Sequence, residues 1–128
     1  MKQQHSLGDL QLAIMRVLWR RGEAAVAEVH EALRAERGLA PTTVATMLVK
    51  MEKKGVVTHR TAGRRFIYRA AVTESEVRRS MVGELTDRLF QGNVTALVNH
   101  LLSEHEHDAD ELAQLQALIA RHHQMEDD

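Results

Sequence analysis

The chain has 128 residues, which is room for one compact domain or for a small domain with a helical appendage. Hydrophobic residues make up 44% of it and charged residues 27%, which excludes a disordered chain, and the absence of cysteine excludes disulfides, thiolate metal sites and thiol catalysis. The formal net charge of −1 conceals two halves of opposite sign, because residues 1–72 hold 13 lysines and arginines against six acids (+7) and residues 73–128 hold four arginines against twelve acids (−8).

Three helices are predicted in the basic half. Apolar residues recur at helical spacing over residues 9–21 and again over 25–37, and a glycine follows each segment as a C-terminal stop. Pro41 stands where a first helical residue tolerates the missing N–H, and helical spacing continues from there over residues 41–54. The last two helices are short and are joined by a tight glycine-containing turn, so they form a helix-turn-helix candidate.

The pattern changes after Gly55 to short β-branched or aromatic runs. Residues 56–60 and 65–69 alternate partially and are separated by residues 61–64, which predicts a β-hairpin. A hairpin directly after a helix-turn-helix is a wing. Any short hairpin could cap a small core, but four arginines favour a wing that meets a polyanion. The arginines are Arg60, Arg64, Arg65 and Arg69.

Three further helices are predicted in the acidic half. Residues 73–76 have the form of a capping box and open a helix that runs to about Gln91, residues 94–103 form a short apolar helix, and the acids of residues 108–111 open a last one. Helices of this length cannot bury their apolar stripes alone, so a second copy of the chain is the simplest partner.

The expected fold is therefore mainly α with a small β-hairpin wing. Residues 1–72 are predicted to form a winged helix-turn-helix DNA-binding domain, and residues 73–128 a helical dimerisation domain. The basic half suits a polyanion, whereas the acidic half would be repelled by one.

The third predicted helix has one apolar and one polar face. A rotation of about 100° per residue gathers three threonines and two lysines on the polar face. They are Thr42, Thr43, Thr46, Lys50 and Lys53. Threonine hydroxyl and methyl groups near a helix N-terminus can read base edges, and lysines further along suit phosphates. A solvent-exposed face would show the same stripe, but its setting beside an arginine-rich hairpin favours DNA binding.

Several stretches closely resemble the penicillinase-repressor family of BlaI and MecI, which has a copper-responsive CopY branch. They are residues 7–19 (LGDLQLAIMRVLW), 40–48 (APTTVATML), 53–57 (KKGVV), 66–68 (FIY) and 92–98 (GNVTALV). The resemblance implies a homodimeric repressor that occupies a palindromic operator in double-stranded DNA and controls target genes, in some members resistance genes. It assigns base and backbone contacts to Thr42, Thr43, Thr46 and Lys50, and wing contacts to Arg64 and Arg65.

Three departures from the family leave the operator sequence and the release mechanism open. Several members carry a basic residue where this chain has Ala45, so the operator sequence can differ. A membrane sensor protease system, a further partner that the resemblance implies, cleaves penicillinase repressors at an Asn-Phe bond in the fifth helix, whereas residues 97–101 here read LVNHL. The copper branch uses C-terminal cysteines, which this chain lacks. The sequence thus identifies neither the operator nor the regulated genes nor the inducing signal.

Two other functions compete with this interpretation. Histidines in the acidic half could hold zinc or nickel and gate repression; they are His100, His105, His107, His122 and His123. A polar loop accounts for residues 104–108 without a metal, so no metal site is predicted. The second alternative is an adaptor that turns its basic face to an acidic protein.

Enzymatic and membrane functions are not expected. The sequence has no glycine-rich phosphate loop, no nucleophile motif and no His-Glu-x-x-His, so neither catalysis nor a cofactor is predicted. No apolar run approaches the roughly 20 residues of a membrane span. A cytoplasmic protein without membrane insertion is expected.

Overall fold

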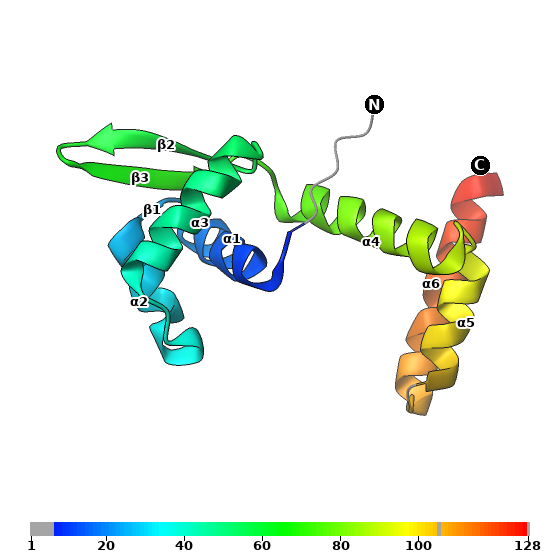
Figure 1. The fold of residues 1–128 in the computed structure, drawn as a ribbon. Coiled ribbons are helices and arrows are strands. Elements are labelled where there is room, and N and C mark those ends of the chain that lie inside the picture. The colour runs from blue at the N-terminus through cyan, green and yellow to red at the C-terminus, as the bar shows by residue number, and fades with distance from the viewer. Residues whose placement is uncertain (1–6, 105, 128) are drawn as a thin grey trace. The chain divides into compact units, whose positions relative to one another are not determined.

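A computed structural model describes residues 7–104 and 106–127. The elements are α1 (Asp9–Arg21), β1 (Ala24–Ala25), α2 (Val26–Arg37), α3 (Pro41–Lys53), β2 (Val57–Ala62), β3 (Arg65–Ala70), α4 (Glu74–Phe90), α5 (Val94–Glu104) and α6 (Ala109–Asp127). Figure 1 shows the paired strands β2 and β3 projecting as a wing beside α1, α2 and α3. The predicted mainly helical fold with a hairpin wing is confirmed.

The chain divides into two compact units, the first ending at Leu85 and the second beginning at Thr86. The boundary lies within α4, whereas the sequence analysis places the functional division after residue 72. The difference arises because the first turns of α4 belong to the core of the first unit: Val77 is buried in that core and Met81 packs against it. The assignment of DNA binding and dimerisation to the two parts stays a prediction.

Helices α1, α2 and α3 begin and end for local reasons that the sequence carries. Gly22 and Gly38 follow α1 and α2 with φ of 86° and 55°, backbone conformations that favour glycine. Pro41 is the first residue of α3. Strand β1 is a departure from the prediction, in which the second helix began at Ala25. A two-residue strand of alanines has no periodicity by which a sequence pattern could reveal it.

The sheet has the strand order β1-β3-β2 and is antiparallel throughout. In the hairpin, Val57 is opposite Ala70 and Ala62 is opposite Arg65. The loop therefore consists of Gly63 and Arg64. Strand β2 reaches closer to the tip than the predicted residues 56–60, whereas β3 begins at Arg65 as predicted. Gly63 has a φ of 64°, the left-handed conformation that a two-residue hairpin loop requires.

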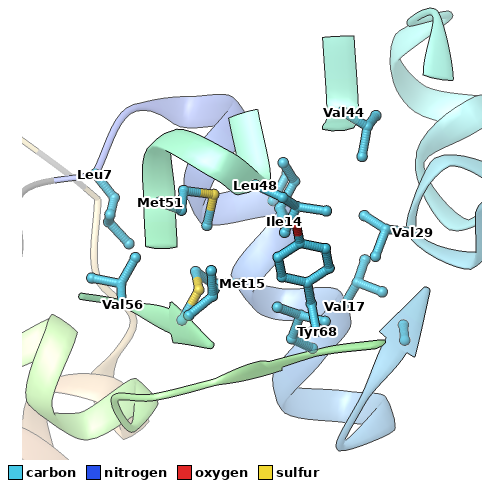
Figure 2. Close-up of a cluster of buried hydrophobic side chains, with 14 of the residues drawn as sticks. Leu7, Ile14, Met15, Val17, Val29, Val44, Leu48, Met51, Val56 and Tyr68 are labelled. Carbon is cyan, nitrogen blue, oxygen red and sulfur yellow. The ribbon is translucent and has the colours of Figure 1, made fainter. Parts of the chain in front are cut away.

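The hydrophobic core of the first unit lies among α1, α2 and α3 and is closed by the sheet (Figure 2). Its labelled members in that view are Leu7, Ile14, Met15, Val17, Val29, Val44, Leu48, Met51, Val56 and Tyr68. Trp19 is partly buried, and its indole N–H donates a hydrogen bond to the carbonyl of Val72 at 2.9 Å. This bond joins α1 to the segment that leads into α4.

The helices of the second unit show the opposite pattern. In the described parts of α5 and α6 no hydrophobic residue is buried. Large apolar side chains are exposed instead, namely Val94, Val98, Leu101, Leu102, Leu112, Leu118, Ile119 and Met125. Across the described residues, no helix combines the length and the apolar character needed to span a bilayer.

Candidate nucleic-acid interface

The exposed face of α3 carries all five of the residues predicted to contact DNA on this helix. The side chains of Val44, Leu48 and Met51 are buried on the other face and fix the rotation of α3 about its axis. The exposed set is Thr42, Thr43, Thr46, Lys50 and Lys53. The threonines occupy the N-terminal turns and the lysines the C-terminal turns, where positive charge is favourable to the helix dipole.

One apolar residue on this face was missed by the sequence analysis. Val49 is 47% exposed, and a rotation of about 100° per residue places it about 20° from Thr42. Its methyl groups suit contact with a thymine methyl. The rotation alone would have found it, but a valine in a helix is usually a core residue.

Gln11 of α1 supports α3 from behind. Its amide contacts the Sδ atom of Met47 at 3.3 Å, and its Oε1 accepts a hydrogen bond from the Nζ of Lys54 at 3.0 Å. Gln11 therefore links α1 to both the middle and the end of α3. No local pattern marks this role, because its partners are 36 and 43 residues away in sequence.

The hairpin arginines differ in their partners. Arg60 donates two hydrogen bonds to Glu23, from Nε at 3.1 Å and from Nη2 at 2.7 Å. Arg65 donates to Glu28 at 3.2 Å. Within the described part of the chain, Arg64 has neither an ion pair nor a side-chain hydrogen bond. The structure thus places Arg64 and Arg65 together at the tip of the wing, but only Arg65 is held by a carboxylate.

Glu23 and Glu28 are the carboxylates that hold the wing arginines, and the pKa of each is lowered from its usual value. The pKa of Glu28 is lowered first by the hydrogen bond from the Ala25 N–H and further by the charges of Arg21 and Arg65. The pKa of Glu23 is lowered first by its hydrogen bond from Arg60. Neither residue was predicted from the sequence, because the wing arginines that they hold, Arg60 and Arg65, are 37 positions away.

An open groove of about 810 Å³ lies between the tip of the wing and the first turn of α2. Its charged lining consists of Arg21, Arg64 and Arg65 against Glu28 and Glu31, and the half-exposed ring of Phe66 forms part of its wall. The positive residues outnumber the negative ones. The groove can therefore receive an anion only in competition with its own carboxylates.

A second set of contacts joins the end of α3 to the wing. The Nδ1 of His59 in β2 pairs with the carboxylate of Glu52 in α3. The His59 ring stacks on Phe66 with centroids 4.2 Å apart and lies 5.5 Å from the Tyr68 ring. Burial raises the pKa of the Tyr68 hydroxyl. These contacts couple the position of the hairpin to that of α3.

The histidines of the acidic half do not form a cluster in the part of the chain that the structure describes. His105 lies outside the described residues, and in the remainder no three His, Asp or Glu side chains are grouped as metal ligands. His107 lies near two protein groups: its Nε2 is 3.2 Å from the carbonyl of Leu101 and its Nδ1 is 3.1 Å from Glu111. The pKa of His107 is raised, chiefly by Glu111.

Three helices packed around one hydrophobic core, a paired wing and an exposed polar face on α3 define a winged helix-turn-helix regulator of transcription. The sequence matches the family model described as "Penicillinase repressor" over residues 7–121, and the chain belongs to this family.

Three similar proteins illustrate this membership. The penicillinase repressor of Bacillus licheniformis is 26% identical over 95% of each chain. The transcriptional regulator BlaI of Mycobacterium tuberculosis is 54% identical over 52 residues, 40% of this chain and 38% of that protein. A solution structure of the Bacillus licheniformis BlaI monomeric form in complex with the blaP half-operator has a TM-score of 0.51 and 33% identity, over 59% of this chain and 93% of that chain.

These comparisons confirm the resemblance that the sequence motifs indicated. The chain is a transcriptional repressor of the BlaI and MecI type and is not an enzyme.

Proposed function

We propose that this repressor binds a palindromic operator in double-stranded DNA as a homodimer, with α3 as its recognition helix. The observation that carries the proposal is the exposed threonine and lysine face of α3 opposite Val44, Leu48 and Met51. A helix that buries one face in its own domain and exposes short polar side chains on the other can enter the major groove. The site of action is then the cytoplasm, where the operator DNA lies.

The residues on this face divide by chemistry. Thr42, Thr43 and Thr46 have short side chains that approach base edges and supply specificity. Lys50 and Lys53 reach phosphates, position the helix and contribute sequence-independent affinity. On the wing, Arg64 is available to a phosphate as the structure stands, whereas Arg65 must first leave Glu28.

The second unit supplies the dimer. Its exposed apolar side chains have no core of their own, and burial against a second copy removes them from water. Its acidic character keeps it away from DNA. In such a dimer, the first units of the two copies, related by a two-fold axis, would meet half-sites about one turn of the DNA helix, 34–36 Å, apart. The similar BlaI structure, described as a monomeric form on a half-operator, supports one head on each half-site.

The family's membrane sensor protease is a further proposed partner, for release of the repressor. It would have to cleave at a bond other than Asn-Phe, because Asn99 in α5 is followed by His100. Both residues are exposed.

Footprinting on the chain's own promoter region tests the proposal. We expect protection of a two-fold symmetric site, a cost of about 1–3 kcal/mol for Thr46→Ala, and relaxed specificity at one base pair. Thr46→Val keeps the branched shape and removes only the hydroxyl, so it separates a hydrogen bond to a base from a methyl contact.

Lys50→Ala should weaken binding to all sequences alike and flatten the slope of log K against log salt by about one unit. Arg34→Ala removes the same charge from an exposed position on α2 and should leave the slope unchanged. If neither Thr46→Ala nor Lys50→Ala alters operator binding, α3 is not the recognition helix.

A further inference from the structure

Glu28 lies at the centre of a charged cluster in the groove between α2 and the wing. Its Oε1 accepts hydrogen bonds from the backbone N–H of Ala25 at 2.9 Å and from the Nη2 of Arg65 at 3.2 Å. Its Oε2 accepts one from the Nη2 of Arg21 at 3.1 Å. One carboxylate therefore holds two guanidinium groups, one from α1 and one from β3.

This arrangement affects how much the two arginines gain from DNA. A cation that neutralises a phosphate strengthens binding because condensed counterions are released. An arginine that already pairs with a carboxylate must give up that partner when it takes a phosphate, and the freed carboxylate would repel the DNA. Arg64 has no such partner among the described residues.

We propose that Glu28 is a positioning residue that withholds Arg21 and Arg65 from DNA phosphates and thereby limits sequence-independent binding. The inference rests on the proposed DNA-binding function. Glu28 holds Arg65 and Glu23 holds Arg60, so Arg64 is the arginine at the tip that would meet the DNA backbone.

Glu31 shows that position in the groove is not enough for this role. It lines the same groove one turn further along α2, but it forms an ion pair with Arg34 of its own helix. The charged atoms are 3.5 Å apart, and both side chains are 70% exposed. Glu31 thus carries the same charge near the same arginines without holding them. It is a matched control for Glu28.

The test measures the salt dependence of binding to a duplex that lacks the operator. Glu28→Gln keeps an oxygen for the Ala25 N–H, so it should fold, and it removes the charge that holds the arginines. We expect tighter binding and a slope of log K against log salt that is steeper by about 0.9 for each arginine released. Glu31→Gln changes the net charge equally and should leave the slope close to that of the unsubstituted repressor.

Arginine variants that keep Glu28 test the same point. Arg64→Gln should flatten the slope by about 0.9, whereas Arg65→Gln should leave it unchanged. In the Glu28→Gln background, Arg65→Gln should lower the slope again.

The proposal is overturned if Glu28→Gln and Glu31→Gln have equal slopes, or if Arg65→Gln flattens the slope as much as Arg64→Gln does. Either result leaves the recognition helix standing, because that assignment depends on Thr46 and Lys50. A repressor that fails to protect any operator site would instead overturn the proposed function itself.

Discussion

The two units of this repressor are stabilised in different ways. Among the residues whose burial the structure describes, every buried hydrophobic side chain lies between Leu7 and Val77, in the unit that carries α1, α2, α3 and the wing. The described residues of α5 and α6 bury none, although both helices are rich in leucine. The first unit therefore has an apolar core of its own, whereas the apolar surface of the second stays exposed in the single chain, and the proposed dimer rests on this exposure.

The two halves of the sequence also differ in charge. The basic half concentrates lysines and arginines around α3 and the wing, and the acidic half contains no lysine. The proposed division between DNA binding and association of two copies follows this separation of charge. Substitutions that act on one unit and leave the other unchanged test this difference.

The largest effect is expected from the core of the first unit. Leu48 is fully buried in α3, and Leu48→Ala should lower the free energy of unfolding by about 2–5 kcal/mol because it leaves a cavity. Urea unfolding measured at two protein concentrations gives the value. The adjacent Val49 is 47% exposed, so Val49→Ala should change stability by less than about 0.5 kcal/mol. Equal losses for the two variants would contradict the assigned core face of α3.

A smaller effect that depends on concentration is expected from the second unit. Ile119 is 65% exposed on α6, and Ile119→Asp places a charge where the proposed dimer buries apolar surface. We expect association to weaken at least tenfold, about 1.4 kcal/mol, by analytical ultracentrifugation. Gln124→Asp adds the same charge at an exposed position about 140° away from Ile119 and about 120° away from Leu118 around the helix, and it should have little effect. An unchanged dissociation constant for Ile119→Asp would remove this face of α6 from the interface.

Local signals made the elements of the first unit predictable. Glycines at positions 22 and 38, Pro41 and the alternation around Gly63 each act within a few residues, so the helices and the hairpin follow from sequence spacing. The exposed face of α3 also follows from the sequence, because a rotation of about 100° per residue places Thr46 and Leu48 on opposite faces of the helix.

Long-range contacts explain what the sequence did not reveal. Strand β1 exists because Ala24 and Ala25 pair with Tyr68 and Ile67, more than 40 residues later. The hydrogen bond from Arg65 to Glu28 likewise joins residues 37 positions apart. The first unit ends within α4 because Val77 enters a core built from other elements. No pattern along a single segment encodes such partners.

The last prediction concerns pH, to which the two units should respond in opposite directions. In the first unit, the pKa values of Glu23 and Glu28 are lowered from 4.5, so the stability that they contribute is present above pH 4.5 and is lost as the pH falls through the lowered values. In the second unit, the pKa of His107 is raised from 6.5, so its contribution is present below pH 6.5 and is lost as the pH rises through the raised value.

An NMR titration of the His107 ring tests the second half of this contrast. The midpoint should lie above 6.5, and Glu111→Gln should lower it because Glu111 is the largest cause of the shift. Asp110→Asn removes a neighbouring charge of α6 that is not among those causes, so it should leave the midpoint closer to that of the unsubstituted chain. A midpoint at or below 6.5, or one that Glu111→Gln does not move, would show that His107 does not stabilise the second unit through Glu111. Acid would then act on the first unit with no opposing gain in the second.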